Sequence, residues 1–181
     1  MILKIISATD RPDSHAIKIS NYVSTLYKEM GITADVVSLE DFPLNAVIGG
    51  KYGEDIPEVD AFRTPIMEAD GLVFVILEYN GSYPGILKMF VDYLPFPKAF
   101  EKMPMAFIGE ATGAFGGLRA VEQFQMVANY RNALLFSERV FIQRVHDGFD
   151  EETGLKDQFA QGLLESQVRN FARYVKALDQ F

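Results

Sequence analysis

The sequence predicts a doubly wound α/β fold, in which a parallel β-sheet is covered by helices on both faces. Five short apolar runs alternate along the chain with segments of helical periodicity, which is typical of repeated strand–helix units. The runs at residues 71–77 and 105–109 contain no charged side chain, as expected for strands that are buried on both faces. At this length, and without a linker, we expect one domain over residues 1–181.

The first strand–helix unit covers residues 2–30. Residues 2–6 are apolar except for Lys4, which favours a buried strand. After the polar turn 7–14, Asp13 or Ser14 can cap a helix that Gly31 would end. The expected apolar face of this helix consists of Ile19, Val23, Leu26, Tyr27 and Met30.

The second unit begins with a strand at residues 34–39. Residues 41–57 are rich in glycine and proline, so we expect them to form a surface loop. A helix near residues 58–68 would place Val59, Phe62 and Ile66 on one face. Pro65 should kink or restart that helix, because proline lacks the amide hydrogen of the helical ladder.

The third unit begins with the clearest strand in the chain, at residues 71–77. The polar turn 78–83 follows it. Pro84 can then open a helix at its first turn, and Pro95 should end that helix.

The remaining elements complete the sheet and its cover. We expect a strand at residues 105–109, a loop at 110–116, a helix to about residue 131 and a fifth strand at 134–142. The last helix should run from about residue 157 to residue 178. Its expected apolar face consists of Phe159, Leu163, Val168, Phe171, Val175 and Leu178.

Five strands fit the flavodoxin-like order 2-1-3-4-5 better than the six-stranded Rossmann arrangement. In that order strands 1, 3 and 4 are neighbours. The loops after these strands would therefore meet at the carboxyl edge of the sheet, where doubly wound folds bind ligands.

Composition excludes several classes of function. No apolar stretch approaches the roughly 20 residues of a membrane span, and the N-terminus lacks the features of a signal peptide, so we expect a cytoplasmic protein without a membrane partner. The net charge of −8 argues against a nucleic-acid partner. With no cysteine and only two histidines, His15 and His146, in no ligand spacing, we expect no metal site. A redox role would require a bound organic cofactor.

The loop after the first strand has the residue types of a phosphate site. Thr9 and Ser14 offer hydroxyls, Arg11 offers a cation, and the following helix start offers free N–H groups. The alternative is an ordinary helix cap. His15 could also donate to a phosphate or could be a solvated residue at the helix start, whereas His146 is expected at the surface.

Two further loops have features that suit a planar ligand. Residues 78–83 combine polar, aromatic and glycine residues directly after a buried strand, so their backbone could lie against a ring. Residues 111–117 contain three glycines, which permit close approach of the backbone. Either segment could also be an ordinary turn, and neither matches the common dinucleotide or phosphate-loop patterns.

These loops resemble those of the NADPH-dependent FMN reductases, a family of flavin, quinone, chromate and azo-dye reductases. Residues 78–88, Glu-Tyr-Asn-Gly-Ser-Tyr-Pro-Gly-Ile-Leu-Lys, and the following Asp92 are similar to the family signature. Residues 8–14 resemble the family's Gly-Ser-x-Arg-x-x-Ser phosphate loop, and residues 113–119 its third loop. The resemblance covers nearly the whole chain.

The resemblance implies an FMN cofactor, NADPH or NADH as the donor, and a small-molecule electron acceptor such as a quinone, a free flavin or another xenobiotic. It also implies a homodimer or homotetramer. Hydride would pass to the flavin, so no protein side chain is expected to be catalytic. The expected cofactor-binding residues are Thr9, Arg11, Ser14, His15, Ala16, Leu77, Glu78, Tyr79, Asn80, Gly81, Ser82, Thr112, Gly113 and Gly116.

The chain departs from the family pattern at several positions. Ala8 stands for a glycine and would cost about 1 kcal/mol if its φ were positive. Met89 stands for an asparagine and lacks an amide that could bond near the ring or across a subunit boundary. Two other readings remain open at this point, a non-enzymatic one-electron carrier and a scaffold that has lost FMN.

Large apolar side chains follow the second of these loops. Ile86, Leu87, Met89, Phe90, Tyr93, Leu94, Phe96 and Phe100 could form a subunit interface beside the flavin or could be core residues.

Overall fold

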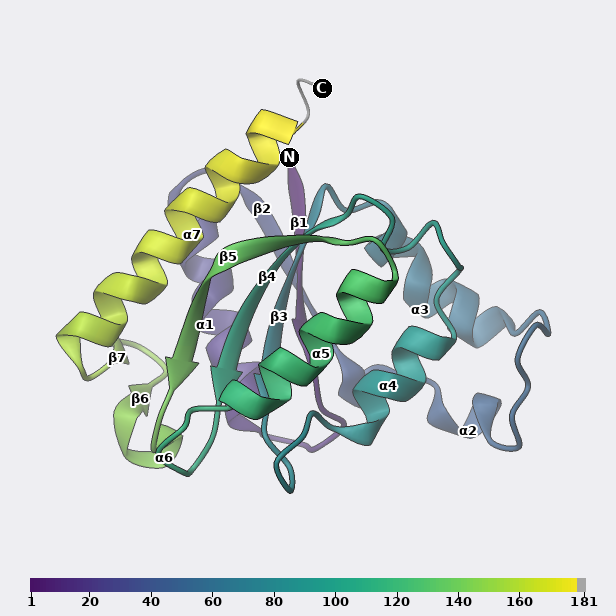
Figure 1. Cartoon of the computed structure of the whole chain (residues 1–181), viewed down its shortest axis with the longest axis horizontal. Coiled ribbons are helices and arrows are strands. Elements are labelled where there is room, and N and C mark those ends of the chain that lie inside the picture. Colours follow the sequence, from purple (N-terminus) through teal and green to yellow (C-terminus); the bar gives the residue numbers. More distant parts are fainter. Residues whose placement is uncertain (179–181) are drawn as a thin grey trace.

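The computed structural model of the protein describes residues 1–178. One parallel sheet with strand order β2-β1-β3-β4-β5 forms its centre (Figure 1), which confirms the predicted flavodoxin-like order. The strands are β1 (Ile2–Ser7), β2 (Thr33–Ser38), β3 (Gly71–Leu77), β4 (Pro104–Glu110) and β5 (Leu134–Ile142).

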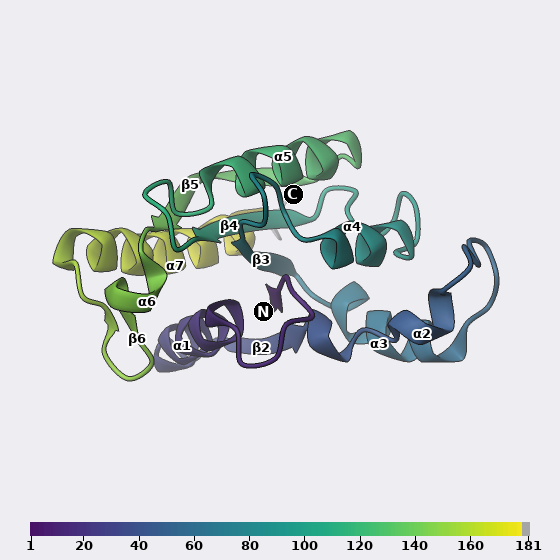
Figure 2. The same ribbon diagram turned by 90° about the horizontal axis from the view of Figure 1, so that it is seen from below.

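Helices cover both faces of the sheet, as predicted. Two of them pack on one face and three on the other (Figures 1 and 2). The first pair is α1 (His15–Glu29) and α7 (Gln158–Leu178), and the second group is α3 (Pro57–Met67), α4 (Gly85–Asp92) and α5 (Leu118–Tyr130).

Short elements join these units. They are η1 (Leu39–Asp41), α2 (Leu44–Val47), α6 (Val145–Gly148) and the two-stranded antiparallel pair β6 (Phe149–Asp150) and β7 (Gly154–Leu155). The predicted surface loop at residues 41–57 is confirmed for residues 48–55, which are exposed, but residues 44–47 form α2. Phe42, which follows η1, and Val47 of α2 are both buried in the core, where the Phe42 ring packs against Phe62 of α3 and Phe90 of α4.

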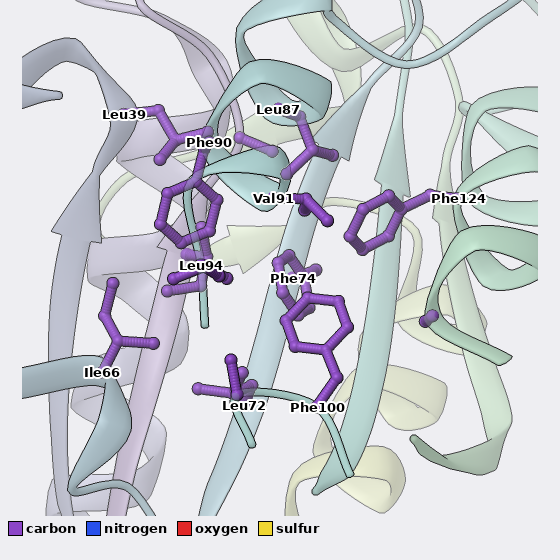
Figure 3. Close-up of a cluster of buried hydrophobic side chains, with 14 of the residues drawn as sticks. Leu39, Ile66, Leu72, Phe74, Leu87, Phe90, Val91, Leu94, Phe100 and Phe124 are labelled. Atoms are coloured by element: carbon purple, nitrogen blue, oxygen red, sulfur yellow. The ribbon is translucent and has the colours of Figure 1, made fainter. Parts of the chain in front are cut away.

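The core on the α3–α4–α5 face is built on aromatic side chains. Phe74 of β3 packs against Phe124 of α5, with ring centroids 4.8 Å apart, and Phe100 lies against the same cluster (Figure 3). Phe90, Tyr93 and Phe100 are all buried. They are therefore core residues, as are most of the apolar residues around α4, which leaves the exposed Phe96 as an exception.

Helix α1 follows the prediction at both ends. Ser14 is its N-cap and accepts a hydrogen bond from the amide of Ile17, and Gly31 has a φ of +73° just after its C-terminus. Met30 is exposed, however, because the helix has ended at Glu29 and the chain is already turning toward β2.

Two helices differ in detail from the prediction. Helix α3 is not restarted at Pro65 but continues through it to Met67. In α7, Phe159 and Leu163 are exposed and Leu164 is buried. Spacings of three and four connect Leu164 to Val168 and Phe171, whereas Leu163 and Val168 are five apart, so Leu163 points away from the sheet.

Within residues 1–178, every helix is too short or too polar to cross a lipid bilayer.

Candidate functional site

A pocket of about 330 Å³ lies at the carboxyl edge of the sheet, where β3, β4 and the loop before α1 come together. Figure 2 looks onto this edge. The position is the one at which doubly wound folds bind ligands. Thirteen residues line the pocket, namely Arg11, Asp13, Ser14, His15, Lys18, Leu77, Glu78, Tyr79, Glu110, Ala111, Thr112, Val145 and His146.

The fold brings together many of the predicted site residues. Arg11, Ser14, His15, Leu77, Glu78, Tyr79 and Thr112 all line the pocket. The others lie elsewhere in the same three loops or behind them: Thr9, Ala16, Asn80, Gly81, Ser82, Gly113 and Gly116.

The first loop is shaped by its own hydroxyls. The buried Oγ1 of Thr9 accepts a 3.1 Å hydrogen bond from the amide of Arg11, and Ser14 caps α1. The amides of His15 and Ala16 belong to the first helical turn, which has no acceptor within the helix. With the exposed cation of Arg11 beside them, these amides make a suitable site for an anion.

Ala8 introduces no backbone strain at this loop. It is absent from the residues with positive φ, and its amide donates a 3.0 Å hydrogen bond to the carbonyl of Val75. The expected cost of replacing glycine at this position therefore does not arise, because the residue continues the pairing of β1 with β3.

Two histidines meet beside the first loop. Nε2 of His15 and Nδ1 of His146 lie 2.8 Å apart, so one ring donates a hydrogen bond to the other. Burial, followed by the charges of His146 and Lys18, lowers the pKa of His15. His146 is exposed, as expected, but its contact with His15 was not predicted.

The second loop is a tight turn. Asn80 and Gly81 have φ values of +51° and +76°, as in the two-residue turns that Asn-Gly sequences favour. Tyr79 and Ser82 exchange backbone hydrogen bonds of 2.9 and 3.0 Å across it. Gln123 of α5 holds the turn from outside, since its amide nitrogen donates to the carbonyl of Gly81 at 3.0 Å.

Glu78 directs an unpaired carboxyl oxygen into this region. Its Oε1 lies 3.5 Å from a guanidinium nitrogen of Arg119, but its Oε2 is buried and has no hydrogen-bond partner within residues 1–178. A buried oxygen of this kind needs a donor. A ligand with ring N–H groups or hydroxyls could supply one.

The glycines of the third loop have different roles. A Cβ atom on Gly113 would meet nothing within 4 Å, so the backbone there is open to a ligand. A Cβ atom on Gly116 would lie 2.8 Å from the carbonyl carbon of Phe141. Gly116 is therefore required for close packing of the loop on β5, and the sequence pattern did not distinguish this role from ligand binding.

Glu110 is the main site residue that sequence reasoning missed. It is the last residue of β4, lies opposite Leu77 in the β3–β4 register, and is only 5% exposed. Burial raises its pKa to about 7, and the nearby Arg11 partly opposes this shift. A charged residue at the end of an apolar strand was the available signal, but burial depends on the loops around it.

The family model described as NADPH-dependent FMN reductase matches residues 1–147. An NAD(P)H-dependent FMN reductase of Pseudomonas aeruginosa is 29% identical over 163 residues, which cover 82% of this chain and 81% of the relative. A 2-hydroxy-1,4-benzoquinone reductase of a Burkholderia species is 29% identical over 147 residues, covering 78% of this chain and 79% of the relative.

Solved structures share the fold over almost the whole chain. The flavoenzyme NAD(P)H:(acceptor) oxidoreductase of Paracoccus denitrificans has a TM-score of 0.80 at 19% identity, with 97% of each chain covered. A flavodoxin of Bacillus cereus has a TM-score of 0.60 at 12% identity, with 96% of this chain and 98% of the other covered. At these identities the likeness concerns the fold alone.

Proposed function

Since the chain belongs to the NADPH-dependent FMN reductase family, we propose that the pocket at the carboxyl edge of the sheet is its FMN site. The protein is an FMN-dependent oxidoreductase that takes electrons from NAD(P)H and passes them to a small acceptor such as a quinone or a flavin. The residues that hold the cofactor are the part that we propose here.

Two kinds of binding group line this one pocket, and their combination supports the assignment to FMN. Arg11 and the start of α1 suit a phosphate, whereas Glu78 and Tyr79 lead into a rigid turn that suits a flat ring. FMN carries a phosphate at one end and a planar ring at the other. The residues present therefore fit this cofactor.

The phosphate end would lie on the first loop. The guanidinium of Arg11 and the amides of His15 and Ala16 would donate hydrogen bonds to its oxygens, and Ser14 would hold the helix start in position. Thr9 acts indirectly, because its buried hydroxyl fixes the loop through the amide of Arg11.

The ring end would lie on the second and third loops. The turn 79–82 is held by its own backbone bonds and by Gln123, so it would present backbone groups to the ring without rearrangement. The open backbone at Gly113 and the side chain of Thr112 would flank it. When bound, FMN supplies the capacity to accept hydride and to release electrons singly or in pairs, and the protein supplies binding and orientation.

A direct assay tests this function. Purified protein would be titrated with FMN, and oxidation of NADH and of NADPH would then be measured separately with a quinone, with ferric ion and with free flavin as acceptors. We expect FMN binding and nicotinamide oxidation that require no protein partner. Absence of FMN binding would leave the scaffold reading, and binding without nicotinamide oxidation would favour an electron carrier.

We also propose that the protein is a homodimer or homotetramer. A groove of about 660 Å³ lies between α4 and α5, and three large side chains at it are strongly exposed. Phe96 and Met126 are each 67% exposed and Tyr130 is 77% exposed. Met126 and Tyr130 are four residues apart on α5, so they share one face of the helix. Exposed apolar groups in such a cluster favour a protein contact.

A further inference from the structure

Among residues 1–178, no hydrogen bond or ion pair gives the carboxyl group of Glu110 a role in stabilising the fold. It lines the pocket, is only 5% exposed, and makes no side-chain hydrogen bond within residues 1–178. A carboxyl group on a largely buried side chain is costly to ionise when no hydrogen-bond donor compensates for the water that it loses. The carboxyl group of Glu110 is therefore available to a ligand that binds in the pocket.

The pocket contains two other carboxyl groups, but both have cationic partners. Asp13 lies 2.9 Å from the ammonium of Lys18, and Glu78 lies 3.5 Å from Arg119. Among residues 1–178, Glu110 forms no direct ion pair, and the charge that acts on it is that of the nearby Arg11. The same guanidinium is the group that we assign to the phosphate of FMN.

We propose that Glu110 is a specificity-determining residue of the FMN site, which accommodates a phosphate-bearing flavin when its carboxyl group is protonated and opposes it when that group is ionised. This inference rests on the function proposed above. It concerns a residue that the phosphate and ring contacts described there do not include.

The physical basis is competition between negative charges in a confined space. A phosphate monoester carries a charge of about −1.5 to −2 at pH 7. An ionised Glu110 in the same pocket would repel it, and burial weakens the screening by water. A protonated Glu110 carries no charge and can donate a hydrogen bond to a phosphate oxygen or to a hydroxyl of the ribityl chain.

The pKa of Glu110 determines how the affinity for FMN should change with pH. Burial raises the pKa of Glu110 to about 7 in the protein without ligand, and a bound phosphate would raise it further. Well below pH 7 Glu110 is mostly protonated before FMN binds. Above pH 7 binding must be accompanied by proton uptake, so the Kd for FMN should rise by up to about tenfold per pH unit.

Other titrating groups act in a different pH range. Burial, His146 and Lys18 lower the pKa of His15 below its usual value of 6.5, so its charge is lost at more acidic pH. The second ionisation of a phosphate monoester, near pH 6, is also complete by then. Measurements between pH 7 and pH 9 therefore isolate Glu110.

The experiment compares two flavins and three proteins. Flavin-free full-length protein would be titrated with FMN and with riboflavin at pH 7, 8 and 9, and binding would be followed by flavin fluorescence. The proteins are the wild type, Glu110→Gln, which is neutral and nearly isosteric, and His146→Gln, which changes another side chain that lines the pocket.

We expect the Kd of the wild type for FMN to rise at least tenfold across this range, and that of Glu110→Gln to change less than about threefold. His146→Gln should keep the dependence of the wild type. Riboflavin lacks the phosphate, so its Kd should vary little with pH in all three proteins. Equal FMN dependence in the wild type and Glu110→Gln, or equal dependence for both flavins, would overturn the proposal.

A second measurement needs only the wild type, so it tests the proposal even if the Glu110→Gln variant does not fold. Calorimetry of FMN binding at pH 8, in buffers of different ionisation enthalpy, should show uptake of close to one proton, with almost none for riboflavin. Release of protons or no uptake with FMN would contradict the proposal. If the pocket is not an FMN site, FMN will not bind at any pH, and this result is different from FMN binding without the expected pH dependence.

Discussion

The hydroxyl of Ser82 donates a 2.6 Å hydrogen bond to Oε1 of Gln123, which joins the turn after β3 to helix α5. The same amide group donates through its nitrogen to the carbonyl of Gly81 at 3.0 Å. Gln123 thus uses both ends of its side chain to hold one turn. If that turn supports the flavin ring, its rigidity contributes to affinity, because little ordering remains to be done on binding.

Gln123→Ala should therefore weaken FMN and riboflavin to a similar extent. Both ligands carry the ring, and the substitution leaves the turn 79–82 without its outer support. Loss of these two hydrogen bonds should raise each Kd by roughly threefold to thirtyfold. Equilibrium titration with both flavins measures the effect. Gln125→Ala, on the same helix but away from the turn, is the matched control, and a similar loss there would contradict the role of Gln123.

Arg11→Ala should weaken FMN binding and leave riboflavin binding almost unchanged. A charge-assisted hydrogen bond contributes roughly 1.5–3 kcal/mol, which corresponds to a Kd for FMN about tenfold to a hundredfold higher. The loss should be larger at low salt, where screening is weaker. Asn80→Ala, at the turn, should instead affect both flavins. If Arg11→Ala leaves FMN affinity intact, or reduces affinity for riboflavin equally, the first loop is only a helix cap.

Glu110→Gln should stabilise the flavin-free protein at pH 8 and leave its stability unchanged at pH 4. Below about pH 4.5, the usual pKa of a glutamate, both the folded and the unfolded chain are protonated. Between that value and about pH 7 the unfolded chain ionises first, which lowers the free energy of unfolding, and above pH 7 the penalty is constant. Removing the ionisable group should recover about 1–3 kcal/mol at pH 8.

Thermal unfolding at the two pH values measures this difference. Glu101→Gln, at an exposed position, should leave the melting temperature unchanged at both. A lower melting temperature for Glu110→Gln at pH 8 would show that the ionised carboxyl group is stabilising, contrary to its burial.

Met126→Glu and Tyr130→Glu should each convert the oligomer to smaller species, ultimately monomers, at micromolar concentration. Both side chains are strongly exposed in the single chain, so the substitutions should change folding stability by less than about 0.5 kcal/mol. Size-exclusion chromatography with light scattering measures the mass. Asn129→Glu, an exposed neighbour outside the groove, is the control. A wild-type monomer would contradict the oligomer, and an unchanged mass in both variants would move the interface elsewhere.

The fold could be predicted because its signals are local. The charge-free run of β3 lies in the predicted place, β5 has the predicted ends, and Ser14 caps α1 as one of the two expected residues. The Asn80-Gly81 turn also follows from its own residues, since few other dipeptides adopt positive φ at both positions. The errors arose where packing overrides local pattern. Phe42 and Val47 are buried because other elements lie above them, which no nearby residue signals.

The sequence by itself determined the order of strands and helices, the three loops at one edge of the sheet, and the resemblance that points to FMN. Only the tertiary structure decided which side chains share a pocket. His15 and His146 are 131 positions apart and meet because parallel strands end at the same edge. Glu110 is an ordinary glutamate in the sequence, and its pKa is raised because the surrounding loops bury most of its side chain. The spacing of apolar residues indicates which secondary structure a segment forms, whereas burial and charge at a site depend on contacts between distant segments.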